Sequence, residues 1–126
     1  MNTILAIAAG GAIGSVLRYI TSSKIMQVLG SGFPYGTFSV NLIGSFLMGI
    51  LIGLLAKYFA GNQTIHAFLT VGLLGGFTTF SAFSLDTLVL LQRGDFLIAA
   101  AYILSSVILS VAGLWFGLSI MRIILS

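Results

Sequence analysis

Four long apolar stretches make up most of this 126-residue sequence, and they limit the fold more than any other feature. Because 59% of the residues are hydrophobic and only 6% are charged, a water-soluble domain of this size would expose a largely apolar surface. A bilayer core of roughly 30 Å is crossed by about 20 helical residues. The sequence therefore predicts an all-α membrane protein, one domain over residues 1–126, whose four transmembrane helices lie at about 3–22, 36–55, 66–91 and 96–120.

The basic residues are divided almost evenly between the two sides of the membrane. With an even number of crossings, both termini lie on one side together with Lys57 and Arg122, while Arg18, Lys24 and Arg93 lie on the other. The positive-inside rule orients a chain by such an imbalance, which here is a single residue. Either that residue, a partner or the insertion machinery decides the orientation, or the chain inserts both ways and pairs with itself antiparallel. No basic cluster suggests a nucleic-acid partner.

Three pairs of glycines recur at a spacing of four residues, which places both members of a pair on one helix face. Such pairs allow helix backbones to approach closely and predict tight helix packing. The pairs are Gly10 and Gly14, Gly49 and Gly53, and Gly113 and Gly117. Because four short helices cannot surround a useful pore, we expect the chain to form oligomers embedded in lipid.

The reactive side chains are too few and too scattered for an enzyme. The sequence has no cysteine, one histidine, His66 at a predicted membrane edge, and two carboxylates, Asp86 and Asp95. They form no acid pair, metal-ligand cluster or nucleophile–base arrangement. Asp86 is the only carboxylate within a predicted span, where it is expected to be hydrogen-bonded or to reach towards the membrane edge, and it is a weak candidate for proton coupling.

Neutral polar side chains occur at membrane depth. Asn41 lies inside the second stretch, and a buried amide needs partners, so it joins helices or takes part in transport. Tyr102, Ser106 and Ser110 follow one face of the fourth helix at spacings of four residues. Serines in membrane helices commonly bond back to their own helix or pack as small residues, so this polar stripe has a structural explanation as well as a functional one.

Residues 75–84, GGFTTFSAFS, interrupt the third apolar stretch. Gly75 and Gly76 each weaken a helix by about 1 kcal/mol relative to alanine, and the hydroxyls of Thr78 and Thr79 follow. The sequence therefore predicts a third helix that is broken near its middle. Broken membrane helices persist where the freed backbone carbonyls are buried or bind a ligand, and carbonyls suit a cation.

Three phenylalanines in the same stretch, Phe77, Phe80 and Phe83, recur every third residue and share one face if the helix resumes after the glycines. Such a stripe usually packs in a core. An aromatic ring also has a positive edge, however, and edges turned towards a pore can contact a small anion. These residues point to permeation of a small ion without identifying it.

Three motifs together resemble a known family. Residues 10–19, GGAIGSVLRY, are similar to the GGxxGAxxRY opening of the Fluc (CrcB) fluoride channels. Residues 36–46, GTFSVNLIGSF, are similar to their GTxxVNxxGxF segment, and residues 75–84 resemble their GGxTTFSTFS signature. The motifs occur in order in three of the four predicted spans, and the length and span count fit the whole chain.

The resemblance implies a passive, fluoride-selective channel in the bacterial plasma (inner) membrane that exports fluoride. It further implies an antiparallel dual-topology homodimer with two pores, and a structural sodium ion (Na+) bound at the dimer interface by main-chain carbonyls of Gly75 and Thr78. Arg18 would lie in an aqueous vestibule. The implied pore residues are Asn41, Phe80, Phe83, Ser81, Tyr102, Ser106 and Ser110.

Three positions depart from the family pattern. Ala82 replaces a threonine of the signature, which removes a hydroxyl, whereas Ser15 and Leu74 replace a common alanine and cysteine and indicate packing changes. Two other functions remain open. A small dual-topology exporter of cationic drugs would need a carboxylate early in the first span, where Arg18 is the only charged residue. A non-transporting assembly subunit would instead be held together by its glycine faces.

Overall fold

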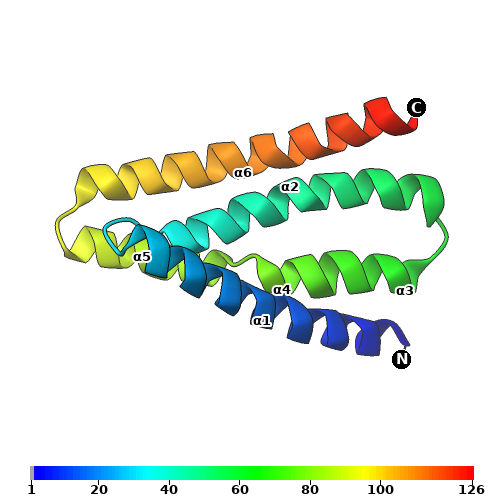
Figure 1. Ribbon diagram of the computed structural model, residues 1–126, viewed down its shortest axis with the longest axis horizontal. Coiled ribbons are helices and arrows are strands. Elements are labelled where there is room, and N and C mark those ends of the chain that lie inside the picture. The colour runs from blue at the N-terminus through cyan, green and yellow to red at the C-terminus, as the bar shows by residue number, and fades with distance from the viewer. Residues whose placement is uncertain (1) are drawn as a thin grey trace.

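The computed structural model describes residues 2–126 as four long helical segments that run alternately up and down (Figure 1). All four are long and apolar enough to cross a membrane, which confirms the all-helical prediction and makes this an integral membrane protein. Both termini lie at the same end of the bundle (Figure 1). The elements are α1 (Asn2–Leu29), α2 (Tyr35–Tyr58), α3 (Gln63–His66), the π-helix η1 (Ala67–Leu74), α4 (Gly75–Phe77), α5 (Phe80–Gln92) and α6 (Phe96–Leu125).

The helices extend beyond the apolar spans expected from the sequence. Helix α1 continues through the polar residues that follow Ser22 and ends at Leu29. Serine and lysine are tolerated in a helix, whereas Gly30 adopts a left-handed φ of 85° that stops it, and its N–H donates to the Met26 carbonyl at 2.9 Å. Gly94 (φ 82°) has the same left-handed conformation in the turn between α5 and α6.

The third segment is broken near its middle, as the sequence predicts, but the break lies beyond the two glycines. Gly75 and Gly76 are helical residues of α4, and the chain becomes extended at Thr78 (φ −89°, ψ 163°) and Thr79 (φ −156°, ψ 122°). The assignment of the break to the glycines is therefore wrong. A Cβ atom at Gly76 would lie 2.9 Å from the carbonyl oxygen of Gly11 on α1, so this glycine is needed for a close helix contact rather than for a break.

The glycine pairs pack helices within the chain, which confirms the tight packing that their spacing predicts. A Cβ atom at Gly10 would lie 2.5 Å from the Phe68 carbonyl oxygen, so α1 lies directly against η1. A Cβ atom at Gly117 would lie 3.2 Å from the backbone nitrogen of Ile50, so α6 lies equally close to α2. Two helix pairs, α1 with η1 and α2 with α6, therefore form the frame of the bundle.

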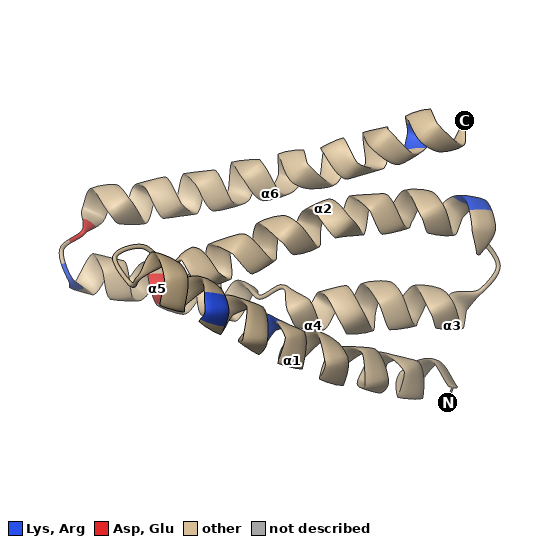
Figure 2. Ribbon diagram, viewed as in Figure 1, with Lys and Arg blue, Asp and Glu red and all other residues tan. Residues whose placement is uncertain are grey.

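Several charged residues lie at the two ends of the bundle, and α1 carries two basic residues along its length (Figure 2). Lys57 and Arg122 are in the last turns of α2 and α6, at the end that carries both termini. Arg93 and Asp95 are in the turn at the opposite end and form an exposed ion pair, with 3.6 Å between Nε and Oδ2. The long helices carry few charged residues between these ends, and their mean composition is apolar enough for lipid to surround them.

Candidate functional site

The break in the third segment is held by a side chain of α2. The Asn41 amide nitrogen donates to the Thr79 carbonyl at 3.0 Å, and the Thr79 N–H donates to Asn41 Oδ1 at 2.7 Å. One amide therefore satisfies both backbone groups of an extended residue, which would otherwise be unpaired at membrane depth. Of the two sequence-based roles for Asn41, the structure supports the joining of helices directly.

Backbone groups next to the break form hydrogen bonds with side chains. The Ala82 N–H donates to Thr79 Oγ1 at 3.1 Å, which makes Thr79 the N-cap of α5, and Arg18 Nε donates to the Gly76 carbonyl at 3.0 Å. In a continuous helix the Thr79 and Ala82 N–H groups would bond to the carbonyls of Gly75 and Thr78. Because both N–H groups point elsewhere, these two carbonyls lose their helical donors.

A cavity of about 400 Å³ lies beside the break, between α2, α5 and α6. It brings together five of the predicted pore residues, and among residues 2–126 no charged side chain lines it. The lining residues are Asn41, Gly44, Ser45, Met48, Thr78, Thr79, Phe80, Phe83, Ser106, Val107, Ser110, Val111 and Leu114. The cavity therefore combines apolar walls with a small set of neutral hydrogen-bonding groups.

The phenylalanine stripe is divided by the break. Phe80 and Phe83 follow it and line the cavity, with ring centroids 5.5 Å apart, and residue Phe80 is 77% exposed. Phe77 precedes the break and is only 8% exposed, packed with Val40 and Leu74. The expectation that all three rings share one face is wrong, because the extended residues between them change the rotation of the chain.

The serines of α6 differ in their hydrogen bonding. Ser105 bonds back to the Ala101 carbonyl at 2.6 Å, the usual arrangement in membrane helices. Ser106 lines the cavity, is only 5% exposed, and its hydroxyl has no hydrogen-bond partner among residues 2–126. Ser110 lines the cavity one turn further on. A buried hydroxyl without a partner is costly in an apolar setting, so Ser106 is suited to bind a water or an ion.

Three of the predicted pore and vestibule residues lie outside the cavity. Tyr102 is fully buried and reaches it only through its ring, which packs on Phe83 with centroids 5.1 Å apart. Ser81 is exposed at the start of α5, with its hydroxyl 3.3 Å from that of Thr79. Arg18 lines a separate pocket of about 150 Å³, together with Ser22, Ser23, Thr37 and the departure Ala82 among others.

Two residues that sequence reasoning did not select contribute to the site. Thr79 lines both the cavity and the Arg18 pocket, so it separates the two. Ser45 lines the cavity one turn after Asn41. The spacing of four residues between Asn41 and Ser45 is a signal that could have identified Ser45, whereas the position of Thr79 depends on where the helix breaks.

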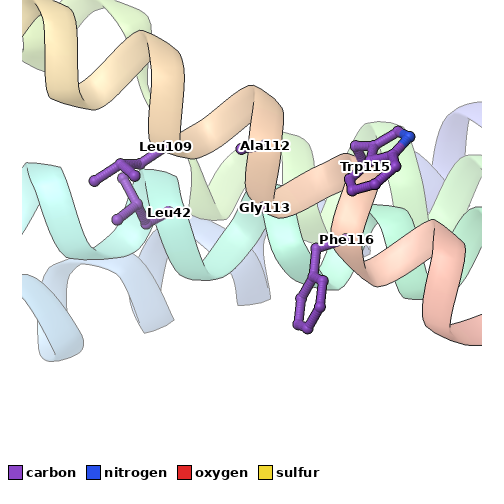
Figure 3. Close-up of a pocket in the computed structure, with 6 residues that line it drawn as sticks. All are labelled: Leu42, Leu109, Ala112, Gly113, Trp115 and Phe116. Atoms are coloured by element: carbon purple, nitrogen blue, oxygen red, sulfur yellow. The ribbon is translucent and has the colours of Figure 1, made fainter.

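A second hollow, between α2 and α6, has a different character. Figure 3 shows its six lining residues, Leu42, Leu109, Ala112, Gly113, Trp115 and Phe116. None of them carries a hydroxyl, a carboxylate or an amide side chain, so this hollow suits an apolar group rather than an ion. Of these two hollows, only the cavity beside the break offers side-chain hydrogen-bonding groups to an ion.

Comparison with known proteins identifies the family. Residues 5–118 match the model of the CrcB-like protein, Camphor Resistance (CrcB), family. The chain belongs to the CrcB-like family. It is 50% identical to the fluoride-specific ion channel FluC of Rhodospirillum centenum over 97% of both chains, and 50% identical to that of Nitrobacter winogradskyi over 96% of both. The FluC of Caulobacter vibrioides is 48% identical over 97% of both chains.

These relatives confirm the resemblance seen in the three motifs. They are named ion channels, so the chain is a member of a channel family and not an enzyme. The relatives match almost their whole length, so the comparison covers all four helices and the cavity beside the break.

Proposed function

We propose that this chain is a passive, fluoride-selective channel whose pathway runs through the cavity beside the break. The observation that carries the proposal is the uncharged cavity at membrane depth, in which the buried Ser106 hydroxyl has no partner and the Phe80 and Phe83 rings form a wall. The names of the relatives, fluoride-specific ion channels, support fluoride as the ion. The bacterial inner membrane is the location that such a channel would need.

Fluoride is small and strongly hydrated, so each water that it loses must be replaced by another donor. The side-chain amide of Asn41 has two N–H groups, of which one bonds to Thr79, so the other is free to face an ion. Ser106 and Ser110 supply hydroxyl donors one turn apart, and the positive edges of Phe80 and Phe83 contact the ion between these donors. Among residues 2–126, no cationic side chain lines the cavity, so none is present there to bind the anion too tightly for release.

The membrane potential supplies the driving force. Moving one elementary charge across a membrane potential of 100 mV changes its free energy by about 2.3 kcal/mol, and a negative cell interior drives an anion outward. Among residues 2–126, no titratable side chain lines the cavity to couple this movement to protons. Export therefore follows the electrochemical gradient of the ion.

The cavity requires a second copy of the chain to become a closed pathway. It opens on the surface of the bundle, where Phe80 is largely exposed, and its polar groups would otherwise face lipid. We propose an antiparallel, dual-topology homodimer with two pores, consistent with the difference of only one basic residue between the two ends. In such a dimer, Arg18 lies in a vestibule that attracts anions towards each pore.

The backbone at the break fits a structural sodium ion. The carbonyls of Gly75 and Thr78 lose their helical donors because the N–H groups of Thr79 and Ala82 bond to side-chain oxygens. Carbonyl oxygens are suitable ligands for a hard cation, and two copies of the break would supply four of them. A bound cation would reduce the cost of holding an anion in a medium of low dielectric constant.

The two other functions have less support. An exporter of cationic drugs would need a carboxylate in its binding site, and neither the cavity nor the apolar hollow of Figure 3 has one among residues 2–126. An assembly subunit held by glycine faces would need those faces free. The closest glycine contacts instead join α1 to η1 and α2 to α6 within one chain.

Efflux from liposomes tests the proposed function. Purified protein in liposomes loaded with fluoride should release it rapidly and electrogenically, and empty liposomes of the same lipid provide the baseline. Efflux no faster than this baseline would refute the channel. Proton-dependent uptake of an organic cation would support the exporter.

Two further experiments address the assembly. A C-terminal tag should be labelled from both sides of the membrane, and labelling from one side only would exclude dual topology. Dialysis into sodium-free buffer should lower the stability or the flux of the dimer, whereas dialysis that replaces only the anion should not. A dimer that is indifferent to sodium would exclude the structural cation site.

A further inference from the structure

A pocket at the end of the bundle that carries both termini brings two basic side chains together. Its volume is about 340 Å³, and it is lined by Lys57 in the last turn of α2 and by Arg122 in the last turn of α6. Figure 2 shows a basic residue near this end of each of the two helices. Among residues 2–126, no carboxylate side chain lines the pocket. It therefore presents two positive charges at one place on the bundle surface.

Neither of these charges is neutralised within the described chain. The one ion pair among residues 2–126 joins Arg93 to Asp95 at the opposite end. Lys57 Nζ donates to the Leu125 carbonyl at 2.6 Å, which uses one of its three N–H groups and leaves two free. Arg122 forms neither an ion pair nor a side-chain hydrogen bond among residues 2–126. Two cations that share a pocket repel each other, and an anion bound between them removes this repulsion.

An aromatic side chain indicates the depth of the pocket in a bilayer. Tyr58 directly follows Lys57 at the end of α2, is 60% exposed, and has its ring centroid 5.9 Å from Lys57 Nζ. Exposed tyrosines gather where a membrane meets water, and basic residues at that level attract lipid phosphates. The two cations therefore lie at the level of the lipid headgroups.

The rest of the pocket wall is largely apolar. Ile52 and Ala56 of α2 and Leu118 and Met121 of α6 line it, and Ile52 is 41% exposed. Ile52 and Leu118 precede the basic residues of their helices by a turn or more, so this wall begins about 6 Å deeper in the membrane than the charges. A small inorganic anion would contact only the charged end. A lipid would contact both parts, the charges with its phosphate and the wall with its acyl chains.

We propose that this pocket binds the headgroup of an anionic phospholipid, with the acyl chains along the apolar wall between α2 and α6. The Arg122 guanidinium holds two phosphate oxygens, and Lys57 adds a second charge. The headgroup is anionic because a choline would bring a third cation into the pocket. The inference depends on membrane insertion and not on the ion that is conducted. In the antiparallel dimer proposed above, each leaflet contains one such lipid.

Lipid retention in native mass spectrometry tests the site. Phosphatidylglycerol and phosphatidylcholine with identical acyl chains are added in equal amounts to the purified protein in detergent. We expect one phosphatidylglycerol per chain, held roughly 25-fold more tightly than phosphatidylcholine, because each basic residue contributes a factor of about five. Arg122→Gln should lower the affinity for phosphatidylglycerol roughly fivefold, and Arg122→Gln combined with Lys57→Gln roughly 25-fold.

Two choices of variant keep the test specific. Lys24→Gln is the matched control, because it removes an exposed basic residue of α1 that does not line the pocket, and it should retain phosphatidylglycerol fully. Arg122→Gln is the decisive single variant. Lys57 also bonds to a carbonyl at the end of α6, whereas Arg122 makes no such bond whose loss could loosen the helix.

Three results would overturn the lipid site. Equal retention of the two lipids would do so, as would the same loss in Lys24→Gln as in Arg122→Gln. Displacement of phosphatidylglycerol by inorganic phosphate would make the pocket a site for free anions, and retention by single chains but not by the dimer would show that a second copy covers it. Because retention is measured without flux, a chain that conducts no fluoride would refute the channel and leave this test unchanged.

Discussion

The two halves of the third segment, before and after the Thr78–Thr79 break, are built for different contacts. Before the break, η1 and α4 use glycines to lie against the backbone of α1, and the one aromatic ring near the break, Phe77, is buried. After the break, α5 makes far fewer backbone contacts and places Phe80 and Phe83 in the wall of the cavity. The first half therefore anchors the segment, and the second half lines the cavity that we propose as the pathway.

The comparison shows what the break contributes. In one continuous helix, residues at a spacing of three would all face the same neighbour. The two extended residues, Thr78 and Thr79, change the direction in which the following side chains point. Phe77 therefore packs in the core, whereas Phe80 and Phe83 line the cavity. Asn41 stabilises this extended backbone, because its amide replaces the backbone hydrogen bonds that Thr79 would make in a continuous helix.

The largest effect on stability is expected from a methyl group in the anchoring half. In Gly14→Ala, the added Cβ would overlap the Leu73 carbonyl and lie 3.1 Å from the Phe77 nitrogen, so α1 must move away from η1. We expect a loss of about 3 kcal/mol, at the upper end for overpacking, measured by thermal unfolding in detergent. Gly11→Ala is the control, since its Cβ would meet only the Gly72 carbonyl at 4.0 Å. Equal stability of the two variants would contradict close packing as the role of this half.

A smaller effect is expected where the two halves meet. Asn41→Ala leaves the N–H and the carbonyl of Thr79 without their partners, which should cost about 2 kcal/mol and lower fluoride flux as well. Asn62→Ala is the matched control, because Asn62 accepts one hydrogen bond, from the Ile65 N–H, in an exposed cap. If both variants lose the same stability and neither loses flux, Asn41 does not hold the break.

The smallest effect concerns the start of α5. Thr79→Ala removes the side-chain oxygen that accepts from the Ala82 N–H, and the loss of such an N-cap should cost about 1 kcal/mol. Thr79→Ser retains the oxygen and should restore the stability. If alanine and serine at this position give identical unfolding temperatures, the cap does not contribute to holding the second half in place.

The overall fold follows from the sequence more directly than the position of the break. The lengths of the apolar stretches predict four helices, and the glycine spacings predict which helix faces pack closely, because both depend on local patterns. The break was expected at Gly75 and Gly76 because glycine weakens helices. Glycine also permits close contact between helices. The structure shows this second use at Gly76, because the Gly11 backbone of α1 lies directly against it.

The family resemblance implied the pore residues, and spacing in the sequence shows which of them share a helix face. Ser106 and Ser110 share a face of α6 and line the cavity, and Phe80 and Phe83 do so on α5. The Asn41–Thr79 bonds and the Tyr102–Asp86 bond could not be predicted, since they join residues far apart in the sequence. Their formation depends on the rotation of α5, which is set by tertiary contacts.

The central claim is that the second half of the third segment forms the pathway and the first half does not. The most direct test measures fluoride efflux and thermal unfolding together for Phe77→Ile, Phe80→Ile and Phe83→Ile. Removing a ring edge worth about 1.4 kcal/mol should lower flux roughly tenfold in the last two variants, which should unfold at nearly the original temperature. Phe77→Ile should instead lose about 2 kcal/mol of stability, with normal flux for each folded molecule. Normal flux in both Phe80→Ile and Phe83→Ile would contradict the account.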